Sequence, residues 1–331
     1  MGENSSILAS EPMPRAADSI LMDMTPVEGG YVAVGERGHA LVSTDGESWS
    51  QSETPTRSSL TAVWAIGPEV WAAGHDAVIL HSSDGGVTWA RQYVAEDVND
   101  PDLNRPLLDV FFVDSDNGFA IGAYAFYLRT RDGGETWEEL DFNSLVASGD
   151  EAEVVEEESA DDDGGYQDYS DFEDEFFDYH LNGMARLADG TLFIAAEMGN
   201  AFVSRDSGES WIPVMMPYEG SMFGALATAH GTLVSYGLRG NAFESRDGGE
   251  SWIVLETGTL NSLFGATNGA DGSLVLVGAN AEFLVRSAPG SPIESRPHAG
   301  GDDIAAVAVV EDGFVIVGEE GAERYSAAGG Q

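Results

Sequence analysis

The chain of 331 residues contains no cysteine and no lysine. The missing cysteine excludes disulfide bonds, zinc–thiolate centres and cysteine nucleophiles, but it does not fix the compartment. All 14 basic residues are Arg, and they stand against 58 acidic residues, which gives a net charge of −44. A surface this acidic repels nucleic acid phosphates and anionic lipid head groups, so we expect neither as a partner. A salt-adapted or secreted surface and a cationic protein partner both explain such a charge.

Long hydrophobic runs are missing too. The longest, IAAVAVV, covers residues 304–310, whereas a membrane-spanning helix needs about 20 apolar residues. The first residues, MGENSSILASEP, have neither the basic nor the apolar region of a signal peptide. We therefore expect a protein that does not itself span a membrane. A previously removed export signal is compatible with this start.

What the sequence has in abundance is a repeated motif with Ser or Thr, Asp, Gly, Ser or Thr, and Trp. The five copies are STDGESW from residue 43, SSDGGVTW from 82, TRDGGETW from 130, SRDSGESW from 204 and SRDGGESW from 245. Each follows a β-rich run and a small residue eight positions earlier, at Gly35, Gly74, Gly122, Ala196 and Gly237. Two later segments, LVLVGANAEFLVRSAPG and FVIVGEEGAERYSAAGG, keep only this upstream half.

The seven aligned copies lie 39, 48, 74, 41, 41 and 40 residues apart. A period near 40 residues with several short strands per unit is the signature of a β-propeller. We therefore predict one all-β domain over residues 1–331, a seven-bladed β-propeller of four-stranded antiparallel blades. The last unit lacks a fourth strand, so we expect residues 5–10 to complete it and close the ring.

The repeated Asp motif is predicted to be structural. In the unit from Ser59, alternating hydrophobicity predicts strands in LTAVWAI, VWAAG, AVILHS and TWARQYV, with the motif in the last hairpin. There, Asp and Ser or Thr can accept hydrogen bonds from turn amides, and Trp can pack on the next blade. Five repeated catalytic or metal-binding Asp residues make less chemical sense, and we expect no metal and no cofactor. The predicted structural residues are Asp45, Trp49, Asp84, Trp89, Asp132, Trp137, Asp206, Trp211, Asp247 and Trp252.

These motifs resemble the Asp-box, or BNR, repeat. The upstream half, as in VAVGERGHALVS, is similar to the photosystem II stability/assembly factor family, and the similarity covers all seven units. This resemblance implies a non-catalytic lumenal or periplasmic protein that docks a membrane protein during assembly. The family's binding patch is basic, whereas this chain is acidic, so a client other than the photosystem is expected.

Function is expected on the face opposite the Asp motifs. In a four-stranded antiparallel blade, the second turn and the connection to the next blade share that face. Most connections span 11 residues from the motif Trp to the next strand, but Trp89 to Leu107 spans 18 and Trp137 to Leu181 spans 44. Repeat proteins build binding surfaces from such variable positions on a constant frame.

The longest connection forms an insertion at residues 141–180. Its 15 acidic residues between 149 and 180, with no Arg among them, leave the rest of the chain with a net charge of −29. Its aromatic residues include Tyr169, Phe172, Phe176 and Phe177. These aromatic residues could dock on a basic, partly apolar surface of a partner, or they could fold back on the propeller rim. The sequence favours the two alternatives equally. The DDDGG segment does not match the EF-hand spacing.

The second turns of the blades supply the other candidate binding residues. They are Arg37, His39, His75, Asp76, Tyr124, Met198, Asn200, Arg239 and Asn241. Asn280, Glu319 and Glu320 occupy the corresponding turns of the last two blades.

The predicted function is a non-catalytic, protein-binding propeller. We expect it to be an assembly factor or accessory subunit of a membrane complex, such as a transporter, on the periplasmic side, with the cytoplasm as the alternative compartment. The alternative function is a glycoside hydrolase, since Asp-box propellers include sialidases. A glycosidase needs two opposed carboxylates, for which Asp76, Glu197 and Glu319 are candidates, but the Arg trio of sialidases is not recognisable.

Overall fold

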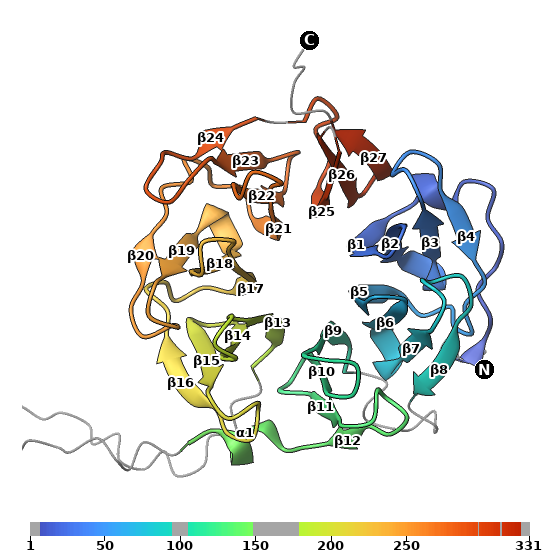
Figure 1. Ribbon diagram of the computed structural model, residues 1–331, viewed down its shortest axis with the longest axis horizontal. Coiled ribbons are helices and arrows are strands. Elements are labelled where there is room, and N and C mark those ends of the chain that lie inside the picture. The colour runs from blue at the N-terminus through green and yellow to red at the C-terminus, as the bar shows by residue number, and fades with distance from the viewer. Residues whose placement is uncertain (1–6, 95–104, 148–178, 297, 312, 326–331) are drawn as a thin grey trace, which may run out of the picture.

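The computed structural model describes residues 7–94, 105–147, 179–296, 298–311 and 313–325. They form seven antiparallel sheets arranged as blades around a central axis, with the first strand of each blade innermost (Figure 1). The predicted seven-bladed β-propeller is therefore confirmed. Apart from short 3-10 turns, the one helix among the described residues is α1 (Phe142–Leu145). None of the described helices is long and apolar enough to cross a bilayer.

Six blades have four strands, and the seventh has three within the described residues. The strands are β1 (Leu21–Val27), β2 (Gly30–Gly35), β3 (Ala40–Ser43) and β4 (Ser50–Ser52) in blade 1; β5 (Leu60–Ile66), β6 (Glu69–Gly74), β7 (Ile79–Ser82) and β8 (Ala90–Tyr93) in blade 2; β9 (Leu107–Phe112), β10 (Gly118–Gly122), β11 (Tyr127–Thr130) and β12 (Glu138–Glu139) in blade 3; β13 (Leu181–Arg186), β14 (Leu192–Ala196), β15 (Asn200–Ser204) and β16 (Ile212–Met215) in blade 4; β17 (Met222–Ala227), β18 (Leu233–Gly237), β19 (Ala242–Ser245) and β20 (Ile253–Val254) in blade 5; β21 (Leu263–Asn268), β22 (Leu274–Gly278), β23 (Phe283–Arg286) and β24 (Glu294–Ser295) in blade 6; and β25 (Ile304–Val310), β26 (Gly313–Gly318) and β27 (Gly321–Tyr325) in blade 7.

The hydrophobic core is divided into seven clusters, one at each junction between neighbouring blades. At the first junction, Val32 and Val34 of blade 1 pack with Leu60 and Val70 of blade 2. Burial of each such side chain contributes about 1.5–3 kcal/mol. Because every blade shares its core with two neighbours, the described residues have no single central core.

Ring closure differs from the prediction that residues 5–10 complete the last blade. Residues 5 and 6 lie outside the described residues. Ser10 exchanges two hydrogen bonds with Thr54, which follows β4, at 2.9 and 3.0 Å, so the segment runs along the outer edge of blade 1. The chain then passes through the 3-10 turn η2 (Ala16–Asp18), which contacts β27. Closure comes from packing instead, with Leu21 and Met24 of blade 1 against Ala306 and Val315 of blade 7.

The Asp motifs lie in the last hairpins of blades 1 to 5, as predicted, and lock those turns. In blade 3, the Thr130 hydroxyl accepts the N–H of Gly134 at 2.8 Å and donates to Asp132 at 2.8 Å. Asp132 accepts the N–H and the O–H of Thr136 at 2.9 and 2.6 Å. These hydrogen bonds to its charged form lower the pKa of Asp132.

The motif Trp residues pack on the preceding blade, not on the next one as expected. Trp89 of blade 2 packs in the cluster between blades 1 and 2, and Trp137 of blade 3 in the cluster between blades 2 and 3. The motif glycines face the same way, because a Cβ on Gly86 would come within 2.7 Å of the Val32 side chain of blade 1. The motif therefore fixes its own hairpin and also packs against the preceding blade.

Candidate protein-binding face

The second turns of the blades form a ring of near-identical backbone on the face opposite the Asp motifs. The residue at the apex of each turn in blades 1 to 6 is left-handed, with φ between 54 and 58°. These apices are Arg37, Asp76, Tyr124, Met198, Arg239 and Asn280. Left-handed non-Gly residues are uncommon. Their recurrence at the same position of six turns indicates that the turns share one backbone conformation.

Backbone hydrogen bonds hold this frame. Within the turn of blade 1, Gly35 N–H donates to His39 O at 3.0 Å, and Glu36 N–H donates to Ile20 O at 3.1 Å, just before β1. A Cβ on Gly35 would lie 2.2 Å from that same Ile20 oxygen. The close approach explains the Gly found upstream of the motif in blades 1, 2, 3 and 5. The apex side chains take no part in these bonds and are free to differ.

Blade 4 departs from this frame, and the departure coincides with the return of the insertion. Its small residue is Ala196, and the side chain of Glu197 accepts His180 N–H at 3.1 Å. Just before His180, the carbonyl of Tyr179 accepts Ala125 N–H at 2.7 Å. The returning chain is therefore held by the turn of blade 3 as well as by blade 4.

Three of the predicted binding residues have partners within the protein. His39 is fully buried, with its Nδ1 2.8 Å from the Ser19 hydroxyl, and burial lowers its pKa, so the prediction that its side chain lies on the binding surface is wrong. The Asn200 and Asn241 amides donate back to the carbonyls of Glu197 and Leu238 in their own turns, at 3.0 and 2.8 Å. Both Asn side chains are half-buried, and their part in binding stays a prediction.

The other predicted turn residues do reach this face. Arg37, His75 and Arg239 are exposed, and Asp76 accepts a hydrogen bond from the Ser58 hydroxyl at 2.5 Å. Tyr124 and Met198 are the exposed apolar apices of neighbouring blades 3 and 4, with 51% and 66% of their surface accessible. The Tyr124 ring meets the His180 ring edge-on at 5.1 Å between centroids. Two exposed apolar apices of neighbouring blades therefore lie near the return point of the insertion, and Tyr124 contacts it directly.

The insertion leaves the propeller from the outer edge of blade 4. Phe142 of α1 is fully buried in the cluster between blades 3 and 4. Leu145 O accepts Trp211 N–H at 2.8 Å, and Ala147 N–H donates to Trp211 O at 2.8 Å, which adds a short parallel segment beside blade 4 (Figure 1). Tyr169, Phe172, Phe176 and Phe177 lie outside the described residues, so their role stays a prediction.

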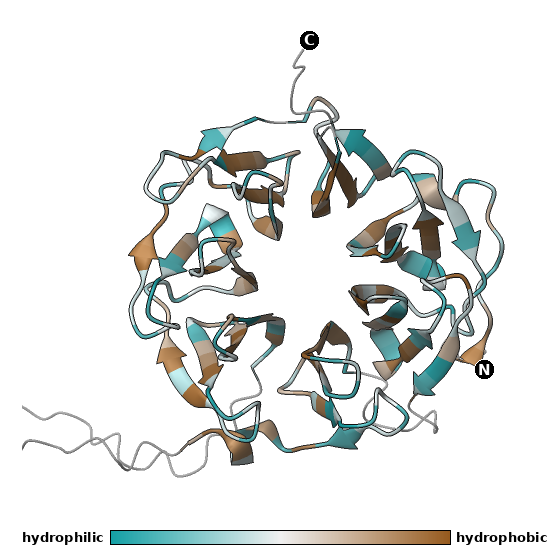
Figure 2. Cartoon of the chain, viewed as in Figure 1, coloured by the Kyte–Doolittle hydropathy of each residue, from teal (hydrophilic) through white to brown (hydrophobic). Residues whose placement is uncertain are grey.

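Two features of the surface and interior were not predicted. The outermost strands of blades 4 and 5 are apolar, whereas those of blades 1 to 3 are hydrophilic (Figure 2). The exposed residues are Ile212, Met215, Ile253 and Val254.

The second feature is a central cavity of about 480 Å³ between the innermost strands. It contains Asp23 and Asp109, whose carboxyls have raised pKa values of about 7, and Tyr236. The sequence signal for it was an Asp inside each of two apolar strands, LMDMTPV and LLDVFF.

Known proteins resemble this chain in structure but not detectably in sequence. No family model and no curated protein matches it. The structure of YCF48 bound to a D1 peptide matches with a TM-score of 0.66 at 15% identity, over 97% of this chain and 94% of that one. YCF48 from Cyanidioschyzon merolae matches at 0.64 and 15%, over 94% and 95%, and the WD40 propeller domain of Doa1 at 0.65 and 10%, over 100% and 98%. At these identities the likenesses show the fold that this chain shares with them, a β-propeller.

Proposed function

We propose that this protein is a non-catalytic propeller that binds a basic protein partner on the face formed by the second turns and the blade-to-blade connections. The observation that carries the proposal is the pair of exposed apolar apices, Tyr124 and Met198, displayed on left-handed turns of neighbouring blades. Exposed aromatic and Met side chains on a rigid frame are typical anchors of protein interfaces. The acidic surface supplies the long-range attraction for a basic partner.

The fuller form of the proposal makes the partner a membrane protein or its periplasmic domain. The chain would then act as an assembly factor or accessory subunit, with a transporter as the candidate client. Support comes from the repeat resemblance to photosystem assembly factors and from the likeness to YCF48, which was solved bound to a D1 peptide. The periplasmic location is part of the proposal.

Hydrolysis of glycosides gains no support from the carboxylates on this face. Asp76 is bonded to the Ser58 hydroxyl, and Glu197 accepts the His180 N–H. Glu319 accepts Asp303 N–H at 3.5 Å across the turn of blade 7. All three side chains have local structural partners, and we expect no turnover of an arylglycoside panel.

The test is affinity purification of the full chain from native membranes, with partner recovery quantified. The substitutions Tyr124→Asn and Met198→Asn together should reduce recovery at least about tenfold, a loss in line with two interface anchors. Asn is chosen because it tolerates the left-handed conformation at both apices. The matched control is Val87→Asn, which removes an exposed apolar side chain from the opposite face.

Recovery should also fall steeply as the salt concentration rises, because the attraction is electrostatic. Equal loss of the partner in the Val87→Asn control, or full recovery with the double variant, would refute the proposed face.

A further inference from the structure

The central cavity is lined by residues of all seven innermost strands, from β1 to β25. The third residue of each of these strands lines the cavity, and it is small in five blades: Ala62, Gly183, Gly224, Gly265 and Ala306. Blades 1 and 3 carry Asp23 and Asp109 instead. Two carboxylates therefore line the cavity at positions where the other blades have Gly or Ala.

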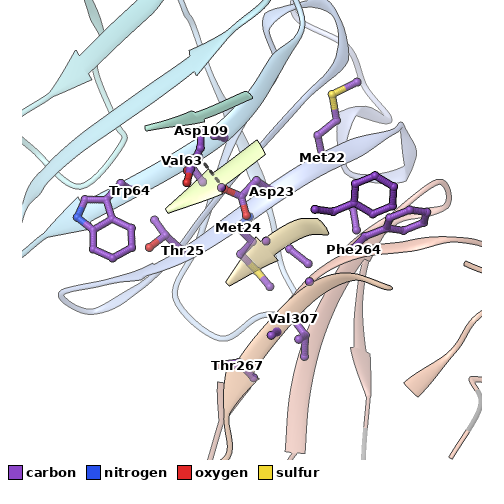
Figure 3. Close-up of a pocket in the computed structure, with 18 of the residues that line it drawn as sticks. Met22, Asp23, Met24, Thr25, Val63, Trp64, Asp109, Phe264, Thr267 and Val307 are labelled. Carbon is purple, nitrogen blue, oxygen red and sulfur yellow. Dashed lines mark hydrogen bonds between the residues drawn. The ribbon is translucent and has the colours of Figure 1, made fainter. Parts of the chain in front are cut away.

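Each of these carboxylates reaches across to the next blade. Asp23 accepts the N–H of Val63 in blade 2 at 2.7 Å and that of its neighbour Met24 at 2.7 Å (Figure 3). Asp109 accepts the N–H of Met184 in blade 4 at 2.7 Å. The amide donors orient the carboxylates but bring no positive charge to them.

A third polar group in the cavity lacks a partner. Tyr236 of β18 is 93% buried and extends over Gly224, where a Cβ would lie 2.5 Å from its hydroxyl oxygen. Among the hydrogen bonds between described residues, none involves this hydroxyl. The hydroxyl is exposed to the cavity, where it can form a hydrogen bond with a ligand.

The second residues of the innermost strands line the end of the cavity nearest the proposed binding face, because those strands begin at that face. Four of them are large and apolar, Met22, Leu108, Phe223 and Phe264, and two are polar, Thr61 and Asn182. The Phe223 and Phe264 rings are 5.9 Å apart. In Figure 3, Met22 and Phe264 lie to one side of Asp23. A ligand entering from this face passes an apolar collar before it meets the carboxylates.

Charge inside the cavity is one-sided. Of the described residues that line it, the ionisable ones are Asp23, Asp109 and Tyr236, and none is Arg or His. Desolvation raises the pKa of both Asp residues to about 7, and for Asp109 the nearby charge of Asp23 adds to the effect. Desolvation also raises the pKa of Tyr236. The ionised carboxylates are therefore destabilised until a cation approaches.

We propose that this cavity binds the cationic head of a Lys or Arg side chain, with its alkyl stem in the collar of Met22, Leu108, Phe223 and Phe264, and its charge at Asp23 and Asp109. The Tyr236 hydroxyl accepts a hydrogen bond from the same head group. The alkyl stem of an amphipathic side chain packs well on apolar walls such as the Phe223 and Phe264 rings. A metal ion fits less well, since no group of three potential ligands converges anywhere in the described residues.

That the cation belongs to a protein partner rests on the proposed function. That the ligand is a cation rests on the cavity alone. The cavity gives the acidic, apolar face a specific recognition element at its centre. Affinity should rise with pH, because binding needs ionised carboxylates whose pKa values lie near 7.

The test uses the full chain with ¹³C-methyl-labelled Met and n-butylammonium as the probe. Of the nine Met residues, Met22, Met24 and Met184 line the cavity, whereas the exposed Met215 lies on the outer edge of blade 4. We expect saturable NMR shifts of the cavity methyl groups at pH 8.5 and none at Met215. At pH 5.5 the apparent affinity should be at least about tenfold weaker, since little of the carboxylate is ionised.

The double substitution Asp23→Asn with Asp109→Asn should weaken binding at least about tenfold and remove its pH dependence. Asp116→Asn, at an exposed carboxylate of the opposite face, is the matched control and should bind as the wild type does. Each single Asn variant provides a second measurement if the double variant does not fold. Equal saturation by uncharged 1-butanol, or binding that the Asn variants leave intact, would overturn the cation site.

A second probe, the peptide acetyl-Gly-Gly-Lys-Gly-Gly-amide, distinguishes the source of the cation. Tighter binding than n-butylammonium, with the same Met22 shift, supports a polypeptide ligand. Absence of that shift would overturn the polypeptide source and leave a site for free amines. Failure of the proposed function looks different, because Tyr124→Asn with Met198→Asn would then leave partner recovery intact while n-butylammonium still shifts Met22.

Discussion

The Asp132 carboxylate accepts hydrogen bonds from Thr130 and Thr136 while remaining at the surface. Equivalent carboxylates in blades 1, 2, 4 and 5 do the same, and their pKa values are lowered, to about 2 for Asp84 and Asp247. Such a residue stabilises its turn only while it is charged. These Asp residues therefore serve as turn locks and not as reactive groups.

Replacing Asp132 by Ala should lower the free energy of unfolding, because three turn donors, the Thr130 hydroxyl and the N–H and hydroxyl of Thr136, lose their acceptor. Urea denaturation measures this change. The matched control is Glu135→Ala in the same turn, whose exposed side chain should contribute within about 0.5 kcal/mol of zero. A similar loss in both variants would mean that the turn does not depend on the Asp132 carboxylate.

Single residues also show where prediction from sequence succeeds. The Asp motifs were predictable because their hydrogen bonds join residues two to four positions apart. Asp23 and Asp109 were not, because their partners Val63 and Met184 are 40 and 75 positions away. The burial of His39 was likewise hidden, since its neighbour Ser19 belongs to the segment before β1.

At the scale of elements, blade 6 lacks the Asp motif and has a buried ion pair with blade 5 in its place. Arg286 stands where other blades have the motif Ser or Thr, and its guanidinium pairs with Glu244 of blade 5 at 2.8 and 3.2 Å. Both side chains are at least 96% buried, and Thr232 donates to the same carboxylate at 2.8 Å. Burial acts to raise the pKa of Glu244, but the bonds from Arg286 and Thr232 outweigh it and lower that pKa.

Glu244→Ala should therefore lower the free energy of unfolding by about 3–5 kcal/mol, because it leaves the Arg286 charge buried without a partner. The double variant Glu244→Leu with Arg286→Met removes both charges and should recover most of that loss. Urea denaturation of the set forms the test. A double variant as unstable as Glu244→Ala would show that packing, and not the uncompensated charge, dominates at this junction.

The order of the strands was predictable from the period of the repeats, whereas the contacts between blades were not. Hydrophobic alternation predicts which residues are buried, but it does not say which neighbouring blade covers them. The motif Trp residues illustrate this, because they pack backwards onto the preceding blade. The segment at Ser10 illustrates it too, because an apolar strand pattern suited blade 7 while its hydrogen bonds are made to Thr54.

Across the whole molecule, two sets of Asp residues respond to pH with opposite sign. Asp23 and Asp109 have raised pKa values of about 7, so between about pH 4 and 7 the folded state binds more protons than the unfolded chain. Their contribution to stability therefore falls as the pH rises through this window. The motif carboxylates, such as Asp84 and Asp247 with pKa values of about 2, contribute stability above about pH 4 that is lost as the pH falls.

We therefore expect stability to be greatest near pH 4 to 5, with a decline on both sides. Thermal unfolding between pH 2 and 9 at constant ionic strength measures this profile. The Asp23→Asn and Asp109→Asn double variant should flatten the decline between pH 5 and 8 and leave the acid side unchanged. A wild-type melting temperature that stays constant from pH 5 to 8 would contradict the raised pKa values.

The backbone-bonded turns on the proposed binding face have an evolutionary consequence. Since the bond from Gly35 to His39 and the bond from Glu36 to Ile20 use no apex side chain, a mutation at Arg37 changes the surface without disturbing the frame. The same separation holds at Tyr124, where Gly122 N–H donates to Phe126 O at 2.9 Å. The residues displayed on the proposed binding face can thus be exchanged one blade at a time, while the ring keeps its fold.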